Sequence, residues 1–366
     1  LENMGISKNF WSGRKVLITG HTGFKGSWLS LWMQFLGAEV IGVSLDQRPG
    51  SSLYKKANVS KNMTSLRQDI CDGKKIKDIF RKYKPEVVFH LAAQPLVMYS
   101  YKNPVETYNT NVMGTLNVLE GIRSVDSVRA AVMITTDKCY ENKEWVWGYR
   151  ENDALGGYDP YSSSKGAAEL LIASYRVSFF PEDKFEEHRT AIASARAGNV
   201  IGGGDWADDR LIPDIICAFQ NGENVNIRSP NATRPWQHVL EPLSGYIQLS
   251  ESLINIGAKR SGAWNFGPRE EDERTVEWVV NKISEYWRGE VSWSLDKDKH
   301  PHEASYLKLD CSKAYIKLGW RPKWNLDKAL LNVIRWYQIE NKGGDCRKIS
   351  IEQIKEFMSS DDNNNK

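Results

Sequence analysis

The sequence has no apolar run long enough to cross a membrane. A transmembrane helix needs about 20 consecutive apolar residues, and no stretch of the 366 residues approaches that length. The first residues also lack the charged and then apolar layout of a signal peptide. We therefore expect a soluble protein that stays in the cytoplasm.

Cysteine is scarce, and clustered metal ligands are missing. The five cysteines are odd in number and widely spaced, which predicts neither a disulfide framework nor a zinc knuckle. They are Cys71, Cys139, Cys217, Cys311 and Cys346. His300 and His302 flank a proline, but no further ligands accompany them, so we predict no metal site.

An excess of either charge is missing as well. The chain has 49 basic and 46 acidic residues mixed along its length, which gives a net charge of +3. Because surfaces that bind nucleic acid normally have clustered lysine and arginine, we expect no nucleic-acid partner. The chain does have 41% hydrophobic and 11% aromatic residues, which is enough for a substantial core.

Short branched apolar runs alternate with helical patterns through the first half of the chain. This alternation predicts an α/β fold in which helices cover both faces of a doubly wound parallel sheet. The expected strands are Lys15–Thr19, Glu39–Leu45, Thr64–Gln68, Val87–Leu91, Ala130–Thr135 and Arg189–Arg196. Apolar residues at helical spacing between Pro104 and Ser124 predict one long amphipathic helix.

The pattern changes after Arg196, where loops rich in glycine, proline and tryptophan separate shorter helical segments. We therefore expect a first domain over residues 1–198 and a smaller lobe over residues 199–350, interleaved with the first domain. Residues 351–366 are expected to form a C-terminal tail whose polar end, SSDDNNNK, is disordered.

A glycine-rich turn follows the first expected strand. In KVLITGHTGFKGSW, the glycines Gly20, Gly23 and Gly26 come between the strand and an apolar helix pattern. Glycine lets the backbone turn sharply and approach a pyrophosphate, whose charge then meets free N–H groups and the positive end of the helix dipole. Asp46 directly follows the second expected strand, where a carboxylate can bind the ribose hydroxyls of an adenosine. Together these features predict a dinucleotide site.

Asp46 also favours NAD over NADP, because its charge would repel a phosphate on the 2′-hydroxyl. Arg48 is a competing signal, since a guanidinium can accept such a phosphate. After the third expected strand, Asp69 and Ile70 either border the adenine ring or belong to a helix cap before KKIKDIF. We expect them at the adenine, with the cap as the alternative.

A candidate catalytic pair lies in YSSSK. Tyr161 and Lys165 are four residues apart, so they share one face of a helix whose start YDP indicates. Such a spacing also arises by chance, but this one follows Thr136 at the end of the fifth expected strand, and a doubly wound sheet binds ligands at that edge. A nearby ammonium and a nicotinamide cation would favour the Tyr161 phenolate, which could then remove a hydroxyl proton as hydride leaves.

These residues resemble those of a known family, the extended short-chain dehydrogenase/reductases. The turn TGxxGxxG, the strand-end threonine and YxxxK are shared, and HLAAQ, NTNVMGTLNVLE, RAGNVIGGGDW and LGWRPKWNLDKAL look like further landmarks of that family. The resemblance implies a Rossmann domain in which Phe24 also contacts the cofactor. It implies that Thr136 binds the substrate hydroxyl, that Tyr161 is the base, and that Lys165 binds the nicotinamide ribose and lowers the Tyr161 pKa.

Within that family, sugar-nucleotide 4,6-dehydratases have an acid and a base directly after the strand-end threonine, usually Asp and then Glu. Asp137 and Lys138 occupy these two places in ITTDKCYEN. Oxidation at C4 of a hexose makes the C5 proton acidic, so a base can remove it while an acid protonates the departing C6 hydroxyl. A lysine base needs a free amine near neutrality, which burial or neighbouring positive charge would favour. The alternative is an ordinary surface pair at a strand end.

The substrate expectation comes from the same resemblance. TTDKCYEN, RPWQHVLEP and HPHEASYLKLD look most like the branch of these dehydratases that acts on CDP-glucose, where lysine replaces the glutamate. This branch feeds deoxysugar and surface polysaccharide synthesis. The resemblance implies Asn199 and Arg234 as ligands of the nucleotide diphosphate, the arginine through two parallel hydrogen bonds. Alternatively, Arg234 belongs to a surface loop.

Two other functions stay open at this point. A sugar-nucleotide 4-epimerase would need Thr136 and Tyr161 but no acid-base pair at positions 137 and 138. A nucleotide sensor without catalysis would not need the intact set of Thr136, Tyr161 and Lys165. As in relatives, the helices expected at Pro104–Ser124 and Tyr158–Phe179 would pair across a two-fold axis, so we expect at least a homodimer.

Overall fold

The computed structural model describes residues 6–46, 51–207, 210–287, 293–296 and 306–360. Its centre is a seven-stranded parallel sheet in the order β11-β6-β5-β4-β1-β2-β3. The strands are β1 (Lys15–Thr19), β2 (Glu39–Ser44), β3 (Thr64–Arg67), β4 (Val87–His90), β5 (Ala130–Ile134), β6 (Ala191–Ala197) and β11 (Gly262–Phe266). The six expected strands are all present, with ends displaced by at most two residues, and the doubly wound fold is confirmed.

Alternate residues of each strand face opposite sides of this sheet, so two hydrophobic cores form. In β1, Val16 and Ile18 belong to one core and Leu17 to the other. Helices α2 (Phe24–Phe35) and α11 (Leu240–Ile256) cover the first side, and α4 (Gly73–Tyr83), α7 (Gly114–Arg123) and α8 (Pro160–Phe179) cover the second. Strands buried on both faces have continuous apolar sequences, which explains why the sequence predicted these strands.

The helix predicted between Pro104 and Ser124 is confirmed, but it changes winding at its centre. It consists of α6 (Pro104–Tyr108), a π-helical turn (Asn109–Met113) and α7. In the π-turn, Asn111 accepts a hydrogen bond from the Gln94 N–H at 2.9 Å and donates one to Ser164 Oγ at 2.8 Å. Ser164 lies on α8, so the π-turn connects the loop after β4 to that helix. Such turns often occur at functional sites.

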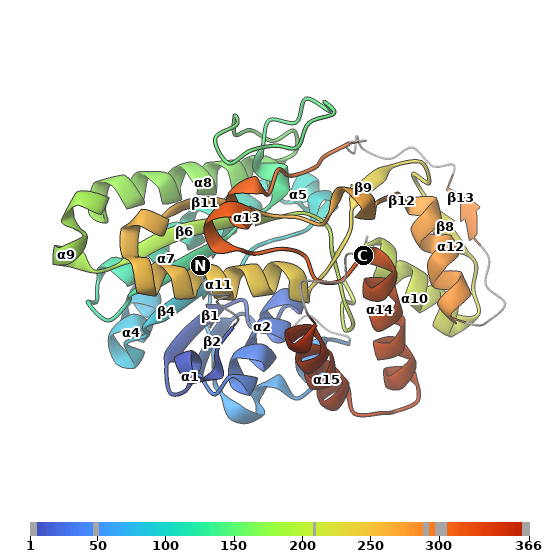
Figure 1. Cartoon of the computed structure of the whole chain (residues 1–366), viewed down its shortest axis with the longest axis horizontal. Coiled ribbons are helices and arrows are strands. Elements are labelled where there is room, and N and C mark those ends of the chain that lie inside the picture. The colour runs from blue at the N-terminus through green and yellow to red at the C-terminus, as the bar shows by residue number, and fades with distance from the viewer. Residues whose placement is uncertain (1–5, 47–50, 208–209, 288–292, 297–305, 361–366) are drawn as a thin grey trace.

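The second half of the chain forms a smaller unit beside the sheet (Figure 1). Its main elements are α10 (Leu211–Asn221), β8 (Val225–Ile227), β9 (Thr233–Pro235), β12 (Glu273–Thr275), α12 (Val276–Trp287), β13 (Trp293–Leu295) and α14 (Leu326–Asn341). Shorter elements of the whole chain are α1 (Lys8–Trp11), α3 (Leu53–Lys56), α5 (Val97–Lys102), α9 (Phe185–His188), β7 (Val200–Ile201), β10 (Gln237–His238) and α13 (Ser312–Leu318). The second half also returns α11 and β11 to the large sheet, where β11 pairs with β6.

The tail predicted for residues 351–366 is wrong in its first part. Helix α15 (Cys346–Ser359) runs through residue 359, and the Asp345 side chain caps it by accepting a hydrogen bond from the Lys348 N–H. Ile354 and Phe357 are buried, and the Phe357 ring lies 5.7 Å from the Trp32 ring on α2. These apolar contacts with distant residues hold the helix in place. Residues 361–366 lie outside the described residues.

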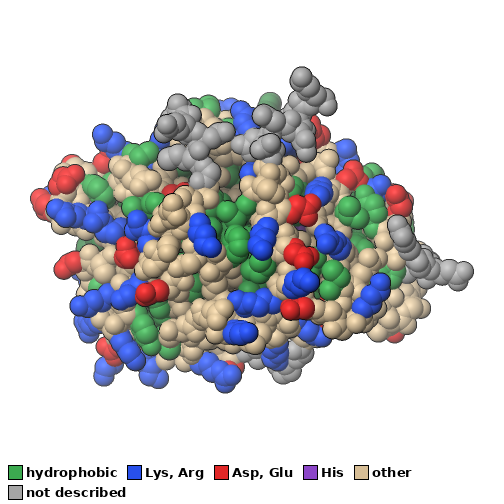
Figure 2. All heavy atoms as spheres, turned by 60° about the horizontal axis from the view of Figure 1, so that its bottom comes forward, with side chains coloured by type: hydrophobic (Ala, Val, Ile, Leu, Met, Phe, Trp, Pro, Cys, Tyr) green, Lys and Arg blue, Asp and Glu red, His purple; other side chains and the backbone are tan. Residues whose placement is uncertain are grey.

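The surface mixes charged and apolar side chains. On the face drawn in Figure 2, acidic side chains lie among basic ones, and hydrophobic side chains form small groups. Within the described residues, no helix is both long and apolar enough to span a bilayer.

A buried ion pair joins the sheet to α8. Glu169 on α8 and Arg196 on β6 each expose 3% of their side chains and lie 2.7 Å apart. Glu169 also accepts hydrogen bonds from Thr135 Oγ1 at 2.5 Å and Ser194 Oγ at 2.7 Å. Burial alone would raise the pKa of Glu169, but the Arg196 charge and the hydrogen bonds from Arg196, Thr135 and Ser194 together hold that pKa below its usual value. The carboxylate is therefore charged and well hydrogen-bonded inside the protein.

Arg196→Met should reduce the free energy of unfolding by about 3–5 kcal/mol, because Glu169 then stays buried without its partner. The double variant Arg196→Met/Glu169→Gln removes both charges and should recover much of that loss. Urea unfolding followed by circular dichroism measures both. Arg81→Met, on the exposed side of α4, is the control and should cost less than about 0.5 kcal/mol. Equal effects of the Arg81 and Arg196 variants would refute a structural role for the pair.

Candidate active site

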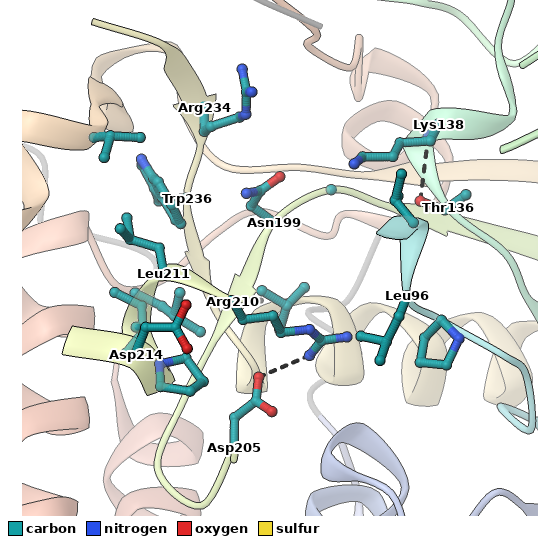
Figure 3. A pocket seen from close by; sticks show the side chains of 18 of the residues that line it. Leu96, Thr136, Lys138, Asn199, Asp205, Arg210, Leu211, Asp214, Arg234 and Trp236 are labelled. Atoms are coloured by element: carbon teal, nitrogen blue, oxygen red, sulfur yellow. Dashed lines mark hydrogen bonds and ion pairs between the residues drawn. The ribbon is translucent and has the colours of Figure 1, made fainter. Parts of the chain in front are cut away.

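A cavity of about 560 Å³ lies at the carboxyl end of β5, between the large sheet and the smaller unit. Segments from both halves of the chain line it, including the residues after β5, the start of α8, the loop after β6, α10, β8 and β9. It brings together seven of the predicted site residues: Phe24, Thr136, Asp137, Lys138, Tyr161, Asn199 and Arg234. Figure 3 shows Lys138 on one side of the cavity, Trp236 on the other, and Asn199 between them.

The acid candidate Asp137 is buried at the strand end. It exposes 3% of its surface, and its Oδ1 accepts a hydrogen bond from Thr136 Oγ1 at 2.9 Å. Burial raises the pKa of Asp137, although the Lys138 charge and the Thr136 hydrogen bond oppose this. A Cβ at Gly198 would lie 2.7 Å from Asp137 Oδ2, so glycine there leaves room for the carboxyl. A carboxyl with a raised pKa can hold a proton and donate it.

Tyr161 and Lys165 lie one helical turn apart at the start of α8. Burial raises the pKa of Tyr161 to about 12, against the Thr136 hydrogen bond and the charge of Arg210. Lys165 is buried and is not among the residues that line the cavity; its Nζ donates to the Ile134 carbonyl at 3.3 Å. Burial lowers the pKa of Lys165 to about 8. Tyr161 therefore needs added positive charge before it can act as a base near neutrality.

Arg210 is a site residue that the sequence analysis missed. It lies just before α10, extends into the cavity and pairs with Asp205 at 2.8 Å (Figure 3). Its charge favours the Tyr161 phenolate. Burial lowers the pKa of Lys25, in the glycine turn, to about 8, and Arg210 adds to this effect. The stretch DWADDR contained the arginine, but an arginine among acidic residues in a loop usually indicates a solvated surface.

The glycine turn fits a pyrophosphate. Gly20 has a φ of +75°, and a Cβ there would lie 2.7 Å from the backbone nitrogen of Ala92. A Cβ at Gly26 would lie 2.1 Å from the Gly20 oxygen, so the turn has no space for a side chain at either position. Helix α2 begins directly after Gly23, whose lack of a side chain leaves the first turn without a side-chain cap. Its N–H groups are thus suited to bind phosphate oxygens.

The adenosine end of the predicted cofactor site lies outside the cavity. Asp46 is exposed at the end of β2 and forms an ion pair with Arg67, on β3, at 2.7 Å. Arg67 was not among the predicted site residues, but its guanidinium lies beside the expected ribose position. Arg48, the residue considered instead, lies outside the described residues. The role of Asp46 therefore stays a prediction.

The alternative interpretation of RQDICD is partly confirmed, because an aspartate of this stretch caps α4. That residue is Asp72, which accepts a hydrogen bond from the Lys75 N–H at 3.1 Å. Asp69 instead accepts one from the Cys71 N–H at 2.8 Å, and Ile70 is buried in the core. Contact of Asp69 and Ile70 with adenine stays a prediction.

The described residues contain no group of three or more histidine, cysteine or acidic side chains that could hold a metal ion. None of the five cysteines, all of which are among the described residues, forms a disulfide. His300 and His302 lie outside the described part of the chain.

Comparisons with known proteins agree with this geometry. The family model of GDP-mannose 4,6 dehydratase matches residues 17–332. A CDP-glucose 4,6-dehydratase of Salmonella typhimurium is 54% identical over 97% of this chain and 99% of its own. A solved UDP-glucose 4-epimerase of Thermotoga maritima with UDP-glucose has a TM-score of 0.75 at 24% identity, covering 89% of this chain and 99% of that one. A dTDP-glucose 4,6-dehydratase of Bacillus anthracis in complex with NAD has a TM-score of 0.73 at 20% identity, covering 91% and 99%.

The two solved structures are distant in sequence, so they support the fold alone. The family model spans most of the chain, and the Salmonella relative matches it nearly from end to end. The chain therefore belongs to the sugar-nucleotide 4,6-dehydratases of the extended short-chain dehydrogenase/reductase family.

Proposed function

We propose that this protein is a lyase that dehydrates CDP-D-glucose to CDP-4-keto-6-deoxy-D-glucose, with NAD as its hydride carrier. One observation above all supports the reaction: Asp137, buried and hydrogen-bonded to Thr136, shares a cavity with Lys138 and Tyr161. The 54% identity with a CDP-glucose 4,6-dehydratase supports the substrate. The glycine turn and the NAD complex of the Bacillus relative support the cofactor.

Each residue of the cavity then has a defined task. Thr136 holds the C4 hydroxyl, and Tyr161 takes its proton. NAD, when bound, would supply a hydride acceptor for C4 and a hydride donor for C6. Lys138 removes the C5 proton, which the C4 ketone has made acidic, and Asp137 protonates the departing C6 hydroxyl. C5 regains a proton from solvent through Lys138, and the proton taken up by Tyr161 is returned to Asp137 by way of solvent, so water is lost without net oxidation.

The remaining predicted contacts complete this proposal. Arg234 and Asn199 bind the diphosphate, while Lys165 binds the nicotinamide ribose and Asp46 the adenosine ribose. The product feeds deoxysugar and surface polysaccharide synthesis, such as lipopolysaccharide O-antigen, in the cytoplasm. A 4-epimerase of the same fold is the second candidate. It would have no use for a buried acid with a raised pKa beside the strand-end threonine, which favours the dehydratase.

Asp137→Asn should permit oxidation at C4 but block loss of the C6 hydroxyl, because the amide cannot donate the required proton. Stopped-flow absorbance should show reduced nicotinamide forming and persisting. Formation of the 4-keto-6-deoxy product should fall by about 100-fold or more, the usual contribution of a general acid.

Tyr161→Phe is the matched control, since it removes the proton acceptor of the first step. It should still bind NAD and CDP-glucose but form no reduced nicotinamide. Product formation by Asp137→Asn at the wild-type rate would remove Asp137 from the proposed chemistry.

We also propose a homodimer through the outer faces of α6 and α8. Apolar side chains are exposed there: Val105 on α6 by 82%, Leu170 on α8 by 62% and Val177 on α8 by 70%. Exposed apolar groups on neighbouring helices commonly mark an interface, and a two-fold axis would bury both sets at once.

Light scattering should therefore give about twice the chain mass of 41.7 kDa, or a higher multiple. Leu170→Glu/Val177→Glu should shift the mass toward the monomer, because it places charge in the interface. Ile316→Glu, at an equally exposed site on α13, should leave the mass unchanged. A monomeric wild type at working concentration would contradict the proposal.

A further inference from the structure

The end of the cavity away from β5 is mainly apolar, but it contains one carboxylate. Leu211 and Trp236 form part of its wall, and Asp214 lies in the first turn of α10. Figure 3 shows Asp214 on the same side as Leu211 and Trp236, across the cavity from Thr136 and Lys138. An apolar wall with a few placed polar groups is suited to a planar heterocycle.

The cations of the cavity indicate how a nucleotide sugar lies in it. Arg210 and Asn199 are drawn between the two ends in Figure 3, and Arg234, which also lines the cavity, lies above them. Diphosphate is the only anionic part of the substrate and is flanked by the hexose and the nucleoside. If the hexose lies at Thr136, as the proposed function requires, the diphosphate meets these groups and the nucleobase reaches the Asp214 end.

We propose that Asp214 determines nucleobase specificity by accepting a hydrogen bond from the 4-amino group of cytosine. An ionised carboxylate has acceptors only. Cytosine presents a donor at position 4, whereas uracil and thymine present a carbonyl oxygen there. The carboxylate would therefore pair with CDP-sugars and repel UDP- and dTDP-sugars. This inference rests on the proposed function for the orientation of the substrate.

The other acidic groups lie in other parts of the cavity. Among its described lining residues the acids are Asp137, Asp205 and Asp214. Asp137 lies at the chemistry end, and Asp205 lies beside Arg210, where the diphosphate is placed. Arg228 also lines the cavity, but a guanidinium can donate to the O2 oxygen that cytosine and uracil share. Asp214 is thus the group whose chemistry distinguishes position 4.

The expected size of the preference for CDP over UDP follows from the exposure of Asp214, which is open to solvent before a nucleotide binds. A hydrogen bond to a charged group in such a place should give a preference of about 10- to 100-fold. A purine with an exocyclic amine could also donate to this carboxylate, so guanosine nucleotides belong in the test.

The test is calorimetric binding of CDP, UDP and GDP, which needs no turnover. Wild-type protein should bind CDP about 10- to 100-fold more tightly than UDP. Asp214→Asn should narrow the ratio to about threefold or less, since an amide both donates and accepts. Glu223→Gln also removes one negative charge, just beyond the end of α10, and should keep the wild-type CDP:UDP ratio. The diphosphate of 2-pyrimidinone riboside, which lacks the 4-amino group, tests the same contact on wild-type protein and should bind more weakly than CDP.

Each outcome decides the inference. An unchanged CDP:UDP ratio in Asp214→Asn, no CDP preference in the wild type, or tighter binding of GDP than of CDP would overturn it. A preference for CDP that depends on Asp214, without dehydration of CDP-glucose, would support the inference and refute the proposed function. Dehydration of CDP-glucose with a preference independent of Asp214 would support the proposed function and overturn the inference.

Discussion

The charged carboxylate of Glu169 organises the catalytic edge of the sheet. It connects α8 to the end of β5 through Thr135 and to β6 through Arg196. Arg196 in turn donates to the Tyr140 hydroxyl at 2.7 Å, and that hydroxyl donates to Asn265 on β11, also at 2.7 Å. One buried ion pair therefore holds three strands, the helix of the proposed base and the segment after Lys138. Because neither charge can be left alone in the interior, the geometry of the site depends on the pair staying intact.

Burial has opposite consequences for the groups that this framework positions. It raises the pKa of Asp137, which suits an acid that must keep its proton. It also raises the pKa of Tyr161 to about 12, which opposes its work as a base. Positive charge resolves this conflict, because Arg210 already favours the phenolate and a nicotinamide cation would add to it. The site thus needs a bound cofactor to begin the reaction, while its acid is ready without one.

Local patterns predicted the sheet and the strand-end cluster because both follow from short stretches. Strands buried on both faces are apolar throughout, and the turn at Gly20 and Gly26 has no room for side chains. The parts that failed or were missed depend on contacts between distant segments. Helix α15 is held by packing against α2, and Arg210 enters the cavity only because the smaller unit folds over the sheet. The residues near either position in the sequence do not contain that information.

The central claim is that one active site oxidises, dehydrates and reduces the same hexose. It is tested most directly with CDP-glucose deuterated at C4, turned over in ordinary water and examined by NMR and mass spectrometry. The account predicts that the deuterium reappears at C6 of the same product molecule, while C5 acquires hydrogen from solvent. Return of the deuterium to C4 with inverted configuration would identify an epimerase. Its loss to solvent would rule out hydride transfer altogether, and either result would contradict the account.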